Sequence, residues 1–287
     1  MPDTAEALGR VRCGVHGVFL AAALTTPLVP LASLPVTLLQ PVGILSWLPW
    51  SFYDRLVTPG GMALLQGLLI ASLLLSTAGL FTRLTTKTSL LLAVFCEGLL
   101  ASFGHHPQDR MVGLYILGVL ACTPCGEGYS LDARRRPVPA ANAWAYGYPI
   151  LLMQAVVAWT YCSAAVLKLH ALGPALFQDA WLPGLGIPRT LGNLWPTHFQ
   201  GAYWLLALRP ALPAVTGLVI AWELLCPIAV LWPRARPWHV GFSLAFHAAS
   251  AVLLNVVFPV QAAMNLVFID WPSVAARLRL DSPVRSR

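Results

Sequence analysis

The side chain best placed for chemistry in this sequence is a lysine near the end of a long apolar run. Lys168 follows Trp159-Thr-Tyr-Cys-Ser-Ala-Ala-Val-Leu, in which Ser163 and Ala164 are small enough to let helices approach closely. A lysine held in a dry pocket can act as a general base. A lysine that snorkels to the membrane interface is the other interpretation, and the position alone leaves both open.

Two carboxylates lie midway along other apolar runs, in Phe-Cys-Glu97-Gly and Ala-Trp-Glu223-Leu-Leu. An ionisable side chain is costly at membrane depth, so each is a candidate for function. A buried carboxylate must be protonated or paired. Glu223 is therefore expected to face the interior of a helical bundle. Both structural pairing and acid–base catalysis remain open for Glu97 and Glu223.

Two polar clusters accompany these residues. The turn Gly104-His105-His106-Pro-Gln-Asp109-Arg110 could bind an acidic headgroup or relay protons, or it could be a solvated loop. Ser243, His247 and Ser250 share one helix face, with His239 a turn earlier. They could hydrogen-bond between helices or line a site, and Gln261 and Asn265 could contribute from the next segment.

The cysteines do not predict a metal site. Cys122-Thr-Pro-Cys125 is a CxxC sequence, but no second CxxC or HxxxH supplies the other zinc ligands. A redox role would need an accessible thiolate, so packing is the favoured interpretation.

The elements that position these groups are predicted to be membrane-spanning helices. Of the 287 residues, 57% are hydrophobic and only 10% charged, against about 25% charged in soluble domains. The apolar runs are continuous, which favours helices over a barrel. We therefore expect an all-α, polytopic transmembrane helical bundle, forming a single integral-membrane domain over residues 1–287 with no separate soluble domain. About eight spans are predicted, at roughly 13–34, 62–81, 88–104, 110–125, 147–168, 213–232, 238–254 and 257–271.

Between the spans, segments 35–61 and 169–212 are rich in Pro, Trp and Tyr, as is typical of interfacial loops. Most basic residues fall on the side that holds both termini, which predicts that both termini are cytoplasmic, and we expect the membrane to be a bacterial plasma membrane. The exceptions on the opposite side are Arg55, Arg110, Arg189 and Arg209. The net charge of +7 is then explained by anionic membrane lipids, without nucleic acid.

This layout brings the polar side chains to the middle or outer half of the membrane. They are predicted to converge on one cavity that opens away from the cytoplasm, with the Trp-rich loops as its roof. Such a cavity fits an enzyme for a lipid-soluble small molecule. The residues concerned are Glu97, His105, His106, Lys168, Glu223 and His247.

Four segments in order resemble the membrane domain of vitamin K-dependent γ-carboxylase and the HTTM (horizontally transferred transmembrane) family, over roughly residues 90–272. They are His105-His106 with Ser130-Leu-Asp132, then Tyr161-Cys-Ser-Ala-Ala-Val-Leu-Lys168-Leu, then Trp181-Leu-Pro-Gly184, and finally Glu223 with Arg236 and Phe246-His247. The sequence departs from the family pattern at His105, Ala165 and Leu167, where the family has Asn, Gly and Lys.

The resemblance implies a reaction driven by a reduced quinone such as menaquinone or vitamin K hydroquinone, with O₂ and CO₂ and no metal. Lys168 would deprotonate the quinol, and the epoxidation that follows would yield an alkoxide strong enough to remove a carbon-bound proton. His106 would stabilise the developing anion. Residues expected to line the cofactor pocket are His247, Ser243, Tyr161 and Trp159. The family's carboxylase holds its protein substrate with a long soluble region, so a small-molecule substrate fits this length better.

The sequence also leaves two other functions open. A cofactor-free isoprenoid cyclase or transferase would use Glu97 or Glu223 as its acid and would work without oxygen or quinone. A transporter or partner subunit would need no shared cavity, although the sequence lacks the internal repeats of common transporters.

Overall fold

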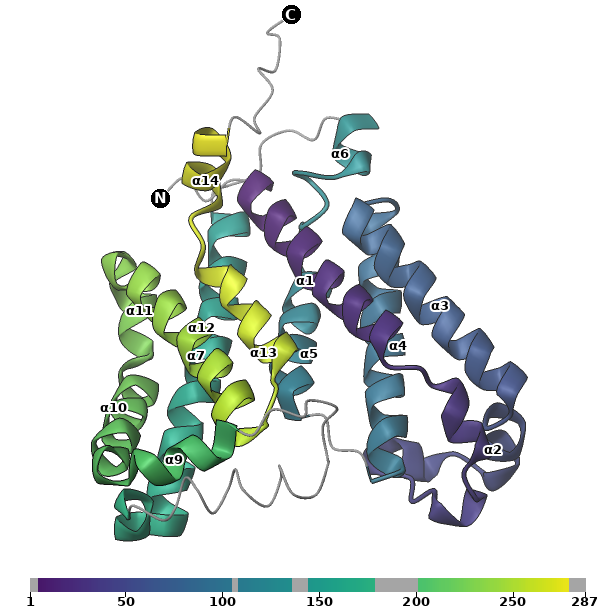
Figure 1. Cartoon of the computed structure of the whole chain (residues 1–287). Coiled ribbons are helices and arrows are strands. Elements are labelled where there is room, and N and C mark those ends of the chain that lie inside the picture. The colour runs from purple at the N-terminus through teal and green to yellow at the C-terminus, as the bar shows by residue number, and fades with distance from the viewer. Residues whose placement is uncertain (1–4, 105–107, 136–143, 179–200, 279–287) are drawn as a thin grey trace, which may run out of the picture. The chain divides into compact units, whose positions relative to one another are not determined.

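The structure, a computed structural model, describes residues 5–104, 108–135, 144–178 and 201–278, and all regular elements in these ranges are helical (Figure 1). Six helical segments are long and apolar enough to cross a membrane. The chain is therefore an all-helical, membrane-embedded protein, as its composition predicts. The six segments are Ala5–Ser33, Pro59–Ala78, Thr82–Ser102, Trp144–Phe177, Arg209–Leu231 and Pro233–Leu254.

The two other predicted spans are helical but short. Helix α5 (Gln108–Ala121) has 14 residues, a length of about 21 Å against the roughly 30 Å of a bilayer core. The segment predicted at 257–271 consists of α13 (Pro259–Ala263) and η8 (Met264–Phe268). Asn255, with a φ of 53°, ends the helix that precedes them. The total of eight spans remains a prediction.

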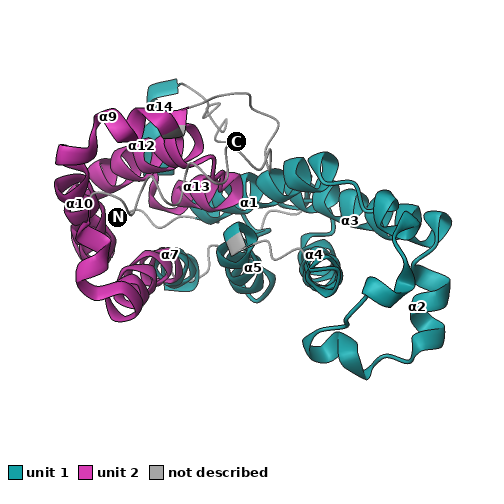
Figure 2. Cartoon of the chain, turned by 60° about the horizontal axis from the view of Figure 1, so that its bottom comes forward, with its two compact units in different colours: residues 1–153, 270–287 teal, residues 154–269 magenta. Residues whose placement is uncertain are grey.

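The chain divides into two compact units, shown in Figure 2. Unit 1 comprises residues 1–153 and 270–287, and unit 2 comprises residues 154–269. Helix α7 (Trp144–Leu172) begins in the first and ends in the second. The prediction of a single membrane domain stays a prediction.

In unit 1, α1 (Ala5–Thr25) packs along α3 (Pro59–Ala78), α3 packs against α4 (Thr82–Ser102), and α4 packs against α5. The buried face of α1 repeats every three or four residues, at Leu8, Val11, Val15 and Phe19, the spacing that aligns side chains on one side of a helix. The shorter elements of this unit are η1 (Val29–Ser33), η2 (Val36–Leu38), η3 (Gly43–Trp47), α2 (Trp50–Leu56), α6 (Leu131–Arg135) and α14 (Trp271–Leu278).

A buried arginine joins three parts of unit 1. The guanidinium of Arg12 donates to the carbonyls of Ser76 and Thr77 at the end of α3, and to those of Cys125 and Tyr129 after α5. The predicted first span, 13–34, begins just after Arg12 and leaves this arginine among the basic residues of the cytoplasmic side. The structure instead begins α1 at Ala5 and leaves Arg12 0% exposed. Its role here is to satisfy carbonyls that helix and loop ends leave unpaired.

The start of α4 is fixed by Asp132, which lies at the start of α6. Asp132 accepts hydrogen bonds from the backbone N–H of Phe81 at 3.0 Å and of Thr82 at 2.7 Å, and from the Thr82 hydroxyl at 2.7 Å. A carboxylate at this place neutralises the free N–H groups and the positive end of the helix dipole.

Unit 2 is built from the second half of α7 with α10 (Leu212–Leu225), α11 (Pro227–Leu231), α12 (Arg236–Leu254), α13 and η8. Cys226 separates α10 from α11, whose first residue is Pro227. The short elements of this unit are η4 (Gly173–Phe177), η5 (Gly201–Tyr203), α9 (Trp204–Ala207), η6 (Arg209–Ala211) and η7 (Pro233–Ala235).

Candidate functional site

The lysine and one of the carboxylates singled out by the sequence form an ion pair in unit 2. Lys168 Nζ, on α7, lies 2.5 Å from Oε1 and 2.8 Å from Oε2 of Glu223, on α10. The Glu223 side chain is 3% exposed and the Lys168 side chain 31%. Glu223 therefore has the partner that a buried carboxylate requires, and Lys168 keeps an exposed part beside it.

Two turns earlier on the same face of α7, Tyr161 is the centre of a hydrogen-bond network. Its hydroxyl lies 2.8 Å from His247 Nε2 and 2.9 Å from Ser243 Oγ, both on α12. The Asn265 amide of η8 donates to the Tyr161 hydroxyl at 3.2 Å and to Ser243 Oγ at 2.9 Å. Tyr161 is 1% exposed, so these contacts are made in the interior of the unit.

Aromatic rings connect this network to the helix that carries Glu223. The Trp222 ring lies 4.8 Å from that of Tyr161 and stacks on His239 at 5.6 Å with an interplanar angle of 21°. His239 also meets Phe268 edge to face at 4.7 Å. The Sγ atom of Cys226 lies 3.6 Å from His239 Nδ1.

Of these rings, Trp222 and His239 form part of the wall of a groove of about 740 Å³ between α10, α11 and α12. Its volume falls within the range of small-molecule sites, and most of its lining is apolar or aromatic, as such sites are. The lining residues are Trp222, Leu225, Cys226, Ile228, Ala229, Ala235, Pro237, Trp238, His239, Gly241 and Phe242.

Three buried polar atoms of the cluster have no hydrogen-bond partner within the described part of the chain: Trp222 Nε1, His247 Nδ1 and Asn265 Oδ1. Buried polar groups are almost always paired, so these three atoms could bond to a ligand. They offer at least one donor, the indole N–H, and one acceptor, the amide oxygen.

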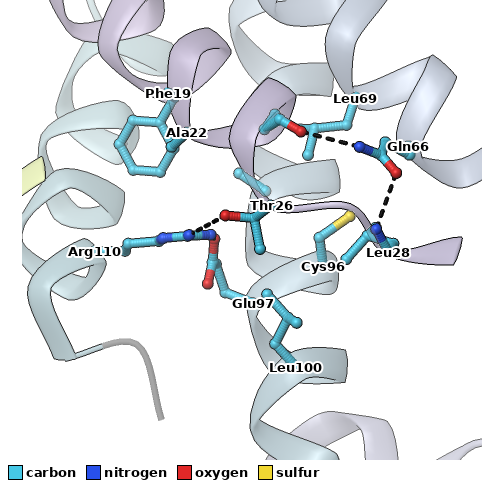
Figure 3. Close-up of a pocket in the computed structure, with 12 residues that line it drawn as sticks. Phe19, Ala22, Thr26, Leu28, Gln66, Leu69, Cys96, Glu97, Leu100 and Arg110 are labelled. Carbon is cyan, nitrogen blue, oxygen red and sulfur yellow. Dashed lines mark hydrogen bonds and ion pairs between the residues drawn. The ribbon is translucent and has the colours of Figure 1, made fainter. Parts of the chain in front are cut away.

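The second carboxylate, Glu97, lies in unit 1 and is also paired (Figure 3). Arg110, from the polar turn, donates through Nη1 to Glu97 Oε1 at 2.8 Å and through Nη2 to the Thr26 hydroxyl at 2.6 Å. The pair borders an enclosed cavity of only about 20 Å³, which is too small for an organic substrate.

Several predicted site residues are placed elsewhere or not described. Trp159, expected to line the cofactor pocket, is 71% exposed and makes none of the contacts of the Tyr161 network. His105, His106 and Trp181–Gly184 lie outside the described residues. The structure brings together Lys168 with Glu223, and Tyr161 with Ser243 and His247. That Glu97 shares a cavity with them stays a prediction.

Sequence reasoning missed Trp222, Cys226 and Thr26. The sequence could have indicated Trp222 and Cys226, because Trp222 directly precedes Glu223 and Cys226 lies one helical turn after it. Thr26 has no such signal, since it stands among apolar residues far from Arg110 in sequence.

Neither a known family, nor a curated protein, nor a solved structure matches this chain.

Proposed function

We propose that unit 2 contains the active site of a membrane enzyme that removes a proton from a lipid-soluble substrate. The observation that carries the proposal is the contact between Lys168 and the buried Glu223, in the same unit as the Tyr161 network and the groove. An acid–base pair at membrane depth, on the same helix as a hydrogen-bonding cluster, is an arrangement suited to proton transfer.

The pair can work as a base through its second protonation form. Transfer of one proton from the Lys168 ammonium to Glu223 leaves a neutral amine and a carboxylic acid, a form favoured where water is excluded. The amine then accepts a proton from a substrate hydroxyl and becomes ammonium again. Glu223 stays protonated as a carboxylic acid and remains hydrogen-bonded to that ammonium, so the pair now holds both protons and carries one positive charge opposite the substrate anion.

The substrate class that fits best is a reduced quinone with an apolar side chain. Its ring has hydroxyl groups that such a base can deprotonate, and the aromatic groove offers Trp222 and His239 for stacking. The resemblance to the vitamin K-dependent carboxylase family supports the same class. It further suggests O₂ as the oxidant of the quinol anion, with epoxidation and carboxylation as the outcome.

The same resemblance and the distribution of basic residues support the finer topology. In this proposal α5 and the α13–η8 segment complete eight crossings, both termini face the cytoplasm of a bacterial cell, and the site opens outward. A cyclase that used Glu97 as its proton donor would need a substrate-sized cavity beside it, and the cavity there has a volume of only about 20 Å³. We therefore favour the quinol-dependent enzyme.

The test is turnover of reduced menaquinone by membranes that contain the protein, followed by mass spectrometry of the quinone and oxygen uptake. Lys168→Ala should abolish turnover, and Glu223→Gln should lower it by about 10²–10⁴-fold. His170→Gln, an exposed position two residues from Lys168, is the matched control and should keep full activity. Oxygen-dependent turnover by Lys168→Ala at the normal rate would refute the assignment of the base. Product formation without oxygen and quinone would support a cyclase instead.

A further inference from the structure

A second hollow, in unit 1, is lined by basic side chains. It has a volume of about 1000 Å³ and lies where α4 begins and the loop after α5 turns back. Arg83 and Lys87, four residues apart on the first turns of α4, and Arg135 of α6 are part of its lining. Thr82, Thr86 and Thr123 line it as well.

The carboxylates of the hollow accept hydrogen bonds from other groups, and the Arg135 charge also acts on Asp132. Asp132 accepts three hydrogen bonds from Phe81 and Thr82, and Glu127 accepts one from the Tyr146 hydroxyl at 2.8 Å. Across the described ranges, Arg83, Lys87 and Arg135 have no carboxylate within 4.0 Å. The hollow therefore offers three basic side chains to an anion from outside the chain.

Apolar side chains flank the cations. Phe81 is 63% exposed, Leu84 68% and Leu131 37%. Leu84 lies in the first turn of the candidate membrane span Thr82–Ser102 and Phe81 directly precedes that span, so both lie at one end of it. Phe81 also has a positive φ of 50°, which is rare for an aromatic residue and is held in place here by Asp132. A free phosphate ion would use only the cations, whereas a phospholipid would use both features.

We propose that this hollow binds the phosphate headgroup of an anionic phospholipid, with Arg83, Lys87 and Arg135 contacting the headgroup and Phe81 and Leu84 contacting the acyl chains. The site is independent of the proposed catalytic site in unit 2. The hollow prefers anionic headgroups, because its basic side chains repel the ammonium group of a zwitterionic headgroup.

The experiment is native mass spectrometry of the full chain in detergent, titrated with phosphatidylglycerol or phosphatidylcholine. Wild type should bind one phosphatidylglycerol in preference to phosphatidylcholine. Arg83→Ala with Lys87→Ala should weaken that binding by about 25-fold, or roughly fivefold for each charge removed. Arg83→Lys with Lys87→Arg keeps both charges and should bind as wild type does, which separates loss of charge from loss of fold.

Arg234→Ala is the matched control, because Arg234 is an exposed basic residue that does not line the hollow. Equal weakening by Arg234→Ala would overturn the proposal, since it would show diffuse attraction to the whole basic surface. Displacement of the lipid by inorganic phosphate at low millimolar concentration would also overturn it in favour of a free-anion site. Retention of binding by Arg234→Ala, without displacement by phosphate, would support the lipid site.

Discussion

Lys168 Nζ contacts both carboxylate oxygens of Glu223, at 2.5 and 2.8 Å, although the two residues are 55 positions apart in the chain. This contact joins α7 to α10 through the interior of unit 2. In this contact each side chain compensates the charge of the other.

Removing one partner of this pair should destabilise the protein more than removing both. Lys168→Met leaves an uncompensated carboxylate that is 3% exposed, and the expected cost is about 1–3 kcal/mol, less than for a fully buried pair because Lys168 is partly exposed. Lys168→Met with Glu223→Leu should recover most of that loss. Unfolding in detergent, followed by circular dichroism over a double-mutant cycle, measures the coupling. Additive losses in the double variant would contradict it.

Tyr161→Phe should weaken the network without disturbing the ion pair. The substitution removes one oxygen that contacts Ser243, His247 and Asn265, and it leaves these buried groups with fewer partners. A loss of about 1–3 kcal/mol in unfolding free energy is expected. Tyr115→Phe, at an exposed tyrosine of α5, is the matched control and should change stability little. Equal stabilities for the two variants would show that the hydroxyl contributes nothing.

Stability should fall at low pH through Asp132. Burial pushes the pKa of this carboxyl up, but hydrogen bonds from Thr82 and Phe81 and the nearby Arg135 charge outweigh it, so its pKa lies below the usual value. The stabilisation is therefore complete above the unfolded pKa of about 3.9 and is lost as the pH falls through the lower folded value.

Asp132→Ala should cost about 1–2 kcal/mol at neutral pH, the usual cost of removing a helix cap. The difference from wild type should shrink below about pH 4. Denaturant unfolding of both proteins between pH 7 and pH 3 measures it. A difference that stays constant over this range would mean that the charge of Asp132 is not what stabilises the start of α4.

The two cysteines of the CxxC sequence should differ strongly in reactivity. Cys122 is exposed, whereas Cys125 is buried, which raises the pKa of its thiol to about 11. Only the thiolate is alkylated, so at pH 8 iodoacetamide should label Cys122 and leave Cys125 unmodified until the protein unfolds. Peptide mass spectrometry reads both sites, with Cys122→Ser as the control for peptide assignment. Rapid formation of a Cys122–Cys125 disulfide under mild oxidant would contradict this and revive a redox role.

Gly79→Ala should be among the most damaging small substitutions in unit 1. Gly79 has a φ of 70°, and a Cβ there would lie 2.4 Å from Ser130 Cβ and 2.8 Å from Arg12 Nη2. A loss of more than about 1 kcal/mol is expected from the backbone conformation alone. Gly67→Ala is the control, because a Cβ at this helical position meets nothing within 4 Å and should stabilise by up to about 1 kcal/mol. Similar melting temperatures for both variants would be inconsistent with a tight junction around Arg12.

The sequence was sufficient to identify a helical membrane protein and most of the polar residues of unit 2. Lys168 and Glu223 are visible because charge is rare in apolar runs, and Ser243 and His247 because they share a helix face. Their partners are not visible, since pairing depends on the rotation of each helix against its neighbours. Tyr161 was expected in the site only through the family resemblance, and the contacts of its hydroxyl come from the structure.

Hydropathy also does not reveal where a helix begins or stops. It placed Arg12 outside the first span, because an arginine beside an apolar run is most often a surface charge. It predicted spans at 110–125 and 257–271, where the structure ends α5 at Ala121 and divides the second segment between α13 and η8, although it ended the preceding span at 254, as α12 does. The buried contacts of Arg12 depend on carbonyls that are far away in sequence, and no local pattern indicates them.

Helix α14 contacts α1, and Arg10 Nη1 donates to the Trp271 carbonyl at 3.4 Å, so unit 1 contains residues from both ends of the sequence. During translation, a nascent chain must reach at least residue 278 before this contact is complete. All of unit 2 is therefore synthesised before the helix that completes unit 1.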